Sequence, residues 1–92
     1  MAHESQEFLT VITDQIRGLL KTHGRLAVDV DSFPEDGDLY SAGLTSHASV
    51  SLMLALEDYF AVEFPERLLR RGAFARISTI RAALLELTSS AP

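Results

Sequence analysis

Apolar residues recur at steps of three and four in three segments of this chain, and that spacing leaves few folds open to it. A stripe with this period covers one face of an α-helix, and the face must be buried against other helices. The stripes are Phe8, Ile12, Ile16, Leu19 and Leu20, then Val50, Met53, Leu54, Leu56 and Phe60, then Ile77, Ile80, Leu84 and Leu87. They predict helices over residues 4–23, 46–60 and 78–87, which together form an all-α bundle.

The connection between the first two helices is long. It runs from about residue 25 to residue 45 and is punctuated by Pro34, Gly37 and Gly43. A loop of this length in a compact domain has to be held against the core. The side chains expected to hold it are Leu26, Val28, Phe33, Leu39, Tyr40 and Leu44.

The remaining segment predicts a short third helix. It runs from about residue 66 to residue 71, after Pro65 and before Gly72. The predicted fold is therefore a small all-α four-helix bundle with a long first loop and a short third helix. We expect a single domain over residues 1–92, with an ordered core of about 4–88.

Composition narrows the classes of function. The chain has 92 residues and a net charge of −5, which disfavours nucleic acid and anionic membranes as main partners. It has no cysteine, so it can supply no disulfide and no thiolate. No apolar run approaches the roughly 18 residues of a membrane span, and the polar N-terminus does not read as a secretory signal. We expect a cytoplasmic protein that does not bind membranes.

Catalytic and metal-binding patterns are missing from the sequence. The histidines, His3, His23 and His47, are widely spaced and form no metal-ligand motif. Glu57 and Asp58 are neighbours on a predicted helix and point in different directions, which favours a solvated helix face. We therefore predict no catalytic residue, no metal site and no enzymatic activity.

One serine has an unusual position. Gly43 and Leu44 end the long loop, and Ser46 opens the second predicted helix. The free N–H groups and the dipole at a helix N-terminus favour an attached phosphate diester. Thr45 or Ser46 could equally cap the helix, and for the local pattern alone a capping role for Ser46 is the simpler interpretation.

The wider pattern around Ser46 resembles a known family. Its elements are Gly43-Leu44-Thr45-Ser46-His47, then Leu56-Glu57-Asp58-Tyr59-Phe60, then Phe64-Pro65, with Asp38-Leu39 upstream. In this register they are similar to the acyl carrier protein family, the phosphopantetheine-binding carrier domains. The resemblance implies that a phosphopantetheinyl transferase attaches 4′-phosphopantetheine from coenzyme A to Ser46. The thiol of that arm then carries an acyl or aminoacyl group as a thioester.

Several residues depart from the family pattern. Thr45 replaces the usual Asp, His47 replaces an apolar residue, and the third helical segment is basic where fatty-acid carriers are acidic. These changes alter electrostatic steering where partners dock. The expected partner face consists of Thr45, His47, Ala48, Ser51, Leu54, Arg67 and Arg70.

The segment 42–77 looks most like the bacterial stand-alone aminoacyl carriers. Those are charged by amino acid:[carrier protein] ligases, which are truncated homologues of seryl-tRNA synthetase. The resemblance implies a monomer that carries a small amino acid from such a ligase to a downstream acceptor enzyme. The alternatives are an acyl carrier of a specialised fatty-acid, polyketide or peptide pathway, and an unmodified helical interaction module. A hydrolase using Ser46 and His47 is disfavoured, because no third group orients the histidine.

Overall fold

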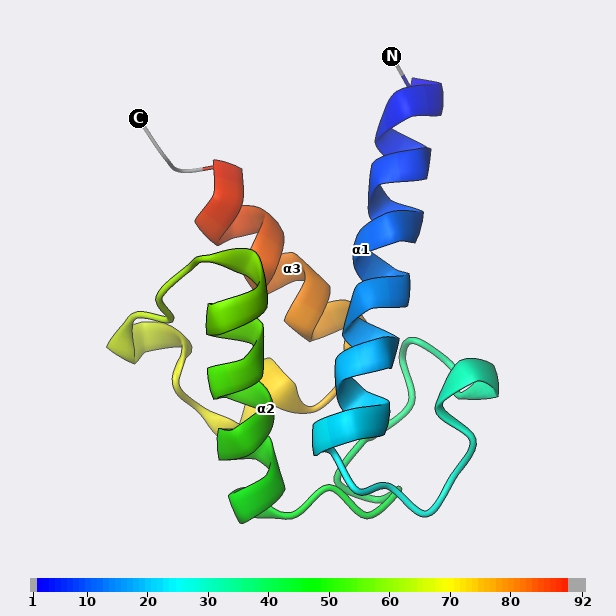
Figure 1. Ribbon diagram of the computed structural model, residues 1–92, viewed down its shortest axis with the longest axis vertical. Helices are drawn as coiled ribbons and strands as arrows, with labels where there is room; N and C mark the ends of the chain where they lie inside the picture. The colour runs from blue at the N-terminus through cyan, green and yellow to red at the C-terminus, as the bar shows by residue number, and fades with distance from the viewer. Residues whose placement is uncertain (1, 90–92) are drawn as a thin grey trace.

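The computed structural model describes the backbone of residues 2–89 and the side chains of residues 6–88. It contains three α-helices: α1 (Ala2–His23), α2 (Ser46–Phe60) and α3 (Ile77–Ser89). Figure 1 shows α1 and α2 joined by the long first loop, with α3 leading back to the end of the molecule where the chain begins. Residues 2–89 include no β-strand, so the all-α prediction is confirmed.

The prediction of a fourth, short helix is wrong. Between α2 and α3 the chain forms two 3-10 turns, η2 (Glu66–Leu68) and η3 (Arg71–Phe74), separated by Leu69 and the extended Arg70. The side chains that this segment turns inward are Leu68 and Phe74. They are six positions apart, so a single continuous helix would place them on different faces. Two short turns allow both to reach the core.

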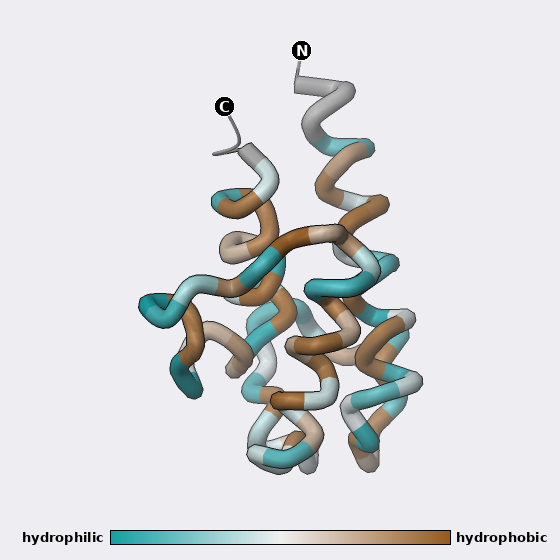
Figure 2. The backbone as a smooth tube through the Cα atoms, turned by 60° about the vertical axis from the view of Figure 1, so that its left-hand side comes forward, coloured by the Kyte–Doolittle hydropathy of each residue, from teal (hydrophilic) through white to brown (hydrophobic). Residues whose placement is uncertain are grey.

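The core is formed by side chains four residues apart on α1 and α2 and by the inward face of α3. Ile16, Leu20, Leu52 and Leu56 are fully buried, and the stripe predicted for α3 is buried at Ile77, Ile80 and Leu84. Burial of such a stripe is what holds a short helix in place. Figure 2 shows hydrophobic residues recurring along the helices between hydrophilic ones.

Some residues of the predicted stripes are exposed. Phe8 is 53% exposed, because the first turns of α1 extend beyond the other helices (Figure 1). Val50 and Leu54 are 53% and 55% exposed, and their places in the core are taken by Ala48 and Leu52. The face of α2 that is turned outward is therefore apolar as well as the face that is buried.

The long loop is held to α1 by Arg17. Its guanidinium donates hydrogen bonds to the carbonyls of Val30 and Phe33, at 2.6 and 2.7 Å. These bonds fix the short 3-10 turn η1 (Val30–Ser32) against α1. Val30 is buried there, whereas Val28, predicted to anchor the loop, is 39% exposed. Leu39 and Leu44 are buried as predicted.

The same loop is tied to the start of α3. The Leu39 amide donates to the Ala75 carbonyl at 2.8 Å, and the Ser78 amide donates to the Glu35 carbonyl at 3.0 Å. The Arg81 guanidinium of α3 bridges Glu35 in the loop and Thr13 in α1. The loop is thus bonded to α1 and to the start of α3, which gives Ser46 a fixed platform.

Glu57 has a structural role that the solvated-face interpretation missed. Its carboxylate accepts a hydrogen bond from the Phe64 amide at 2.8 Å, across the turn that follows α2. Ala61 adopts a left-handed conformation at this turn, with φ of 54°. Phe64 is thereby directed into the core, where its ring lies 5.4 Å from that of Phe74. The number of residues between Leu56-Glu57 and Phe64-Pro65 is therefore set by this turn, which the Glu57–Phe64 hydrogen bond closes.

Candidate functional site

The approach to Ser46 is shaped by Gly43 and Leu44. Gly43 has a φ of +115°, a conformation that a residue with a side chain rarely adopts. The Leu44 amide donates to the Leu39 carbonyl at 3.0 Å, and the Leu44 side chain is buried. The glycine turns the chain and the leucine anchors it, so the helix begins at a defined place.

Thr45, and not Ser46, caps α2. Thr45 has extended backbone angles, and its hydroxyl accepts a hydrogen bond from the Ala48 amide at 3.0 Å. Ser46 is the first residue of the helix, and its side chain is exposed. Its hydroxyl forms no hydrogen bond with any described residue. The alternative that Ser46 caps the helix is therefore wrong, and its hydroxyl is available for chemistry.

Removing the cap should weaken the helix without touching Ser46. We expect Thr45→Val to lower the free energy of unfolding by about 1 kcal/mol, because the Ala48 amide loses its acceptor. Thr45→Asp is the matched control: it keeps an acceptor at the same position and should be at least as stable as the wild type. Urea denaturation followed by circular dichroism measures both. Equal stability of Thr45→Val and Thr45→Asp would contradict the assignment of the cap.

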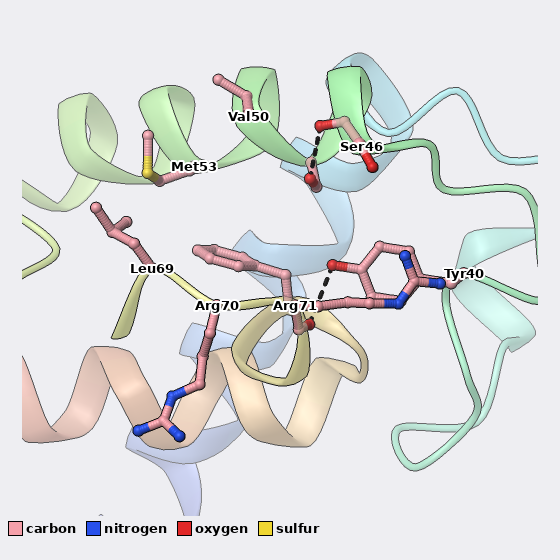
Figure 3. Close-up of a pocket in the computed structure, with 9 residues that line it drawn as sticks. Tyr40, Ser46, Val50, Met53, Leu69, Arg70 and Arg71 are labelled. Carbon is pink, nitrogen blue, oxygen red and sulfur yellow. Dashed lines mark hydrogen bonds between the residues drawn. The ribbon is translucent and has the colours of Figure 1, made fainter. Parts of the chain in front are cut away.

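A pocket of about 380 Å³ lies beside Ser46 (Figure 3). One wall is the outward side of α2, and the facing wall is the segment 69–74. Tyr40, from the long loop, closes one end, next to Ser46. The residues of the two walls are Ser46, Ser49, Val50 and Met53 on α2, and Leu69, Arg70, Arg71 and Phe74 opposite. The lining is mainly apolar, with positive charge at the rim.

Tyr40 and Arg71 are held together by two contacts. The guanidinium carbon of Arg71 lies 3.7 Å from the centroid of the Tyr40 ring, and the Tyr40 hydroxyl donates to the Arg71 carbonyl at 3.0 Å. Asp38 fixes the backbone beneath them by accepting from the Tyr40 amide and the Ser41 hydroxyl. The Ser41 hydrogen bond is the main cause that lowers the pKa of Asp38, and the charge of Arg71 acts in the same direction.

The residues predicted for the partner face differ in their exposure. Thr45, His47, Leu54, Arg67 and Arg70 are all exposed, and Ser51 is partly exposed. Ala48 is only 3% exposed and belongs to the core, so its side chain is not offered to a partner. The prediction was wrong there because Ala48 lies on the inward side of α2, four residues before Leu52.

Two exposed apolar residues that line the pocket were missed as candidates for the partner face. Val50 and Leu69 are 53% and 48% exposed. For Val50 the signal was present in the sequence, since α2 carries more apolar residues than one buried face can use. Leu69 gave no such signal, because its exposure depends on the two turns that replace the predicted helix.

The arginines of the 66–71 segment differ in their environments. Arg67 pairs with Glu86 on α3. The Arg70 side chain donates to the Arg67 carbonyl at 3.0 Å, and within residues 6–88 it pairs with no carboxylate. The positive charge that this edge offers to a partner therefore comes mainly from Arg70 and Arg71.

The described residues give no support to other kinds of site. They include no group of three or more His, Asp or Glu side chains that could hold a metal ion. His47 and Ser46 are both exposed, and within residues 6–88 no hydrogen bond joins them. Over residues 2–89, the helices lack the combination of length and apolar character that crossing a membrane requires.

Comparison with known protein families gives a clear match. The model of the phosphopantetheine attachment site family matches residues 14–85. An aminoacyl carrier protein of Agrobacterium fabrum is 49% identical over 65 residues, which are 71% of this chain and 78% of that protein. Both matches include the stretch from Gly43 to Phe60, in which the family pattern was recognised.

Solved structures agree with the sequence comparison. One is an engineered Bradyrhizobium japonicum glycine:[carrier protein] ligase complexed with a carrier protein from Agrobacterium tumefaciens and AMP. The match has 44% identity and a TM-score of 0.77, and it covers 79% of this chain and 97% of that chain. The corresponding complex with ATP matches with 42% identity and a TM-score of 0.80, covering 83% and 99%.

Proposed function

We propose, from the premise that this chain belongs to the phosphopantetheine attachment family, that Ser46 is the residue that carries its phosphopantetheine arm. The premise rests on the family match over residues 14–85. The observation that carries the proposal is the hydroxyl of Ser46, which is exposed at the first residue of α2 and released from capping by Thr45.

The local environment of Ser46 suits a phosphodiester. The first turn of α2 contributes backbone N–H groups and the positive end of the helix dipole, both of which favour an anion. There is no acidic residue in that first turn to repel one. The cofactor would supply the thiol that this chain lacks, since the sequence contains no cysteine. These features fit a carrier, which needs an accessible anchor and no catalytic group of its own.

The cargo we propose is a small amino acid. This chain is an aminoacyl carrier homologue, and its relative in the solved complexes is bound to a glycine:[carrier protein] ligase with AMP or ATP. By analogy, the ligase would activate the amino acid as its adenylate. The arm held on Ser46 would supply the thiol that accepts the amino acid as a thioester, with AMP released.

The experiment that tests this function identifies what the arm carries. The protein is purified from its own cells under conditions that preserve thioesters, and its intact mass and the released acyl group are measured. The proposal expects one phosphopantetheine per chain and an aminoacyl group on the thiol. An arm that carries only neutral acyl chains would contradict the aminoacyl function, and a protein without an arm would contradict the carrier function itself.

The docking surface for the ligase is proposed to include the exposed side of α2 and Arg70. Thr45, His47, Ser51 and Leu54 remain candidates on α2, joined by Val50. Arg67 is a weaker candidate than Arg70, because its charge is already balanced by Glu86. Rim charges of this kind act mainly on the rate of association.

Charge reversal at Arg70 tests this surface. We expect holo Arg70→Glu to be loaded about tenfold more slowly at low salt, because steering toward the ligase is reversed. Lys21→Glu makes the same change in net charge beside η1, where Lys21 pairs with Asp31, and should be loaded at the wild-type rate. The measurement is kcat/KM for aminoacylation of the holo proteins. Equal rates for wild type and Arg70→Glu would exclude Arg70 from the docking surface.

A further inference from the structure

We infer that Arg71 binds the phosphodiester of the arm on Ser46, with the Tyr40 ring holding the guanidinium in place. This inference rests on the proposed attachment at Ser46. It assigns a ligand to the charged end of the pocket, which the family match leaves without a role.

The first argument is position. Arg71 and Ser46 line the same pocket from opposite walls. Figure 3 shows Ser46 at the end of the pocket that Tyr40 closes, with Arg71 lying against the Tyr40 ring and Arg70 directed away from it. A group attached to Ser46 would therefore share this pocket with Arg71.

The second argument is rigidity. An exposed arginine is ordinarily free to sample many rotamers, and ordering it on a ligand carries an entropic cost. Here the guanidinium is stacked on Tyr40 at 3.7 Å, and the Tyr40 hydroxyl is bonded to the Arg71 carbonyl. Much of the ordering is thus present before any ligand arrives.

The third argument is that the charge of Arg71 is not already balanced. Arg67 pairs with Glu86, and Arg81 pairs with Glu35. Arg71 forms no ion pair with any residue of 6–88. The carboxylate that interacts with it electrostatically is Asp38, whose oxygens already accept hydrogen bonds from the Tyr40 amide and the Ser41 hydroxyl.

The chemistry of a stacked guanidinium completes the case. Stacking uses the flat face of the group, and its N–H donors point outward in the plane. Those donors match the spacing of two phosphate oxygens, and charge-assisted bonds of this kind are the strong ones. Val50, Met53 and Phe74 line the same pocket, and an apolar surrounding strengthens such an attraction.

Phosphorus NMR of the holo protein tests the inference. Wild type, Arg71→Gln and Arg70→Gln are each converted to the holo form, and the mass gain is confirmed before any spectrum is recorded. The ³¹P shift of the diester is then compared with the shift of the same protein in denaturant. We expect a displacement in the folded wild type that falls by at least half in Arg71→Gln. Arg70→Gln removes the same charge one residue away and should retain the displacement.

A second signal keeps the test independent of any change in folding. The side-chain Nε–H resonance of Arg71 should shift between the apo and holo wild type, and added salt should reduce that shift. An unchanged Arg71 resonance, or equal ³¹P displacements in the wild type and Arg71→Gln, would overturn the inference while leaving Ser46 as the anchor. A wild type that never gains the arm would instead overturn the proposed function.

Discussion

Replacing Ser46 with alanine is expected to leave the protein at its unmodified mass after incubation with coenzyme A and a phosphopantetheinyl transferase. The wild type should shift completely to the mass of the holo form under the same conditions. The reason is chemical: in the proposed attachment the arm is bonded to the side-chain oxygen of Ser46, and alanine has none. Intact-protein mass spectrometry gives the result as an all-or-none difference.

Ser49→Ala is the matched control for this experiment. Ser49 lines the same pocket one turn along α2, and its hydroxyl donates to the Ser46 carbonyl at 2.8 Å. This variant should accept the arm. Ser46→Ala itself should remain folded, with stability within about 0.5 kcal/mol of the wild type, because Thr45 supplies the cap. An arm gained by folded Ser46→Ala would refute the assignment of Ser46.

The second large effect is expected in the core. Leu52→Ala should lower the free energy of unfolding by about 2–5 kcal/mol, because it opens a cavity where a fully buried side chain was. A small domain is stable by only about 5–15 kcal/mol, so the loss is a large part of the total. Urea unfolding curves measure it.

Leu54→Ala makes the identical chemical change two residues away. Leu54 is 55% exposed, and its truncation should cost less than about 1 kcal/mol. The pair therefore separates burial from any general effect of leucine on helix α2. Similar losses in the two variants would contradict the orientation of α2 described above.

The helices could be predicted because their inward faces repeat at the helical period. Ile12, Ile16 and Leu20 on α1 and Ile80 and Leu84 on α3 are all buried as expected. The 66–71 segment could not be predicted in the same way, since its inward residues follow no helical period. Its shape depends on Phe64 and Phe74 meeting in the core, and that contact joins residues from separate turns.

For the proposed site, the sequence predicted that Ser46 opens the second helix, and the structure places it there. Its freedom from capping depends on which hydroxyl meets the Ala48 amide. That choice between Thr45 and Ser46 requires backbone angles. The contact of Tyr40 with Arg71 spans 31 residues, and no local pattern marks it.

The long first loop has a consequence for how this protein is degraded. Proteases cut preferentially at segments that open without unfolding the whole domain. Here Arg17 binds two carbonyls of the loop, and Leu39 and Ser78 bond it to the start of α3. A cut between η1 and Gly43 would require those bonds to break together with the packing of α1 and α3. The loop should therefore survive limited proteolysis despite its length. The proposed anchor at Ser46 should be lost only when α1 and α3 unfold as well.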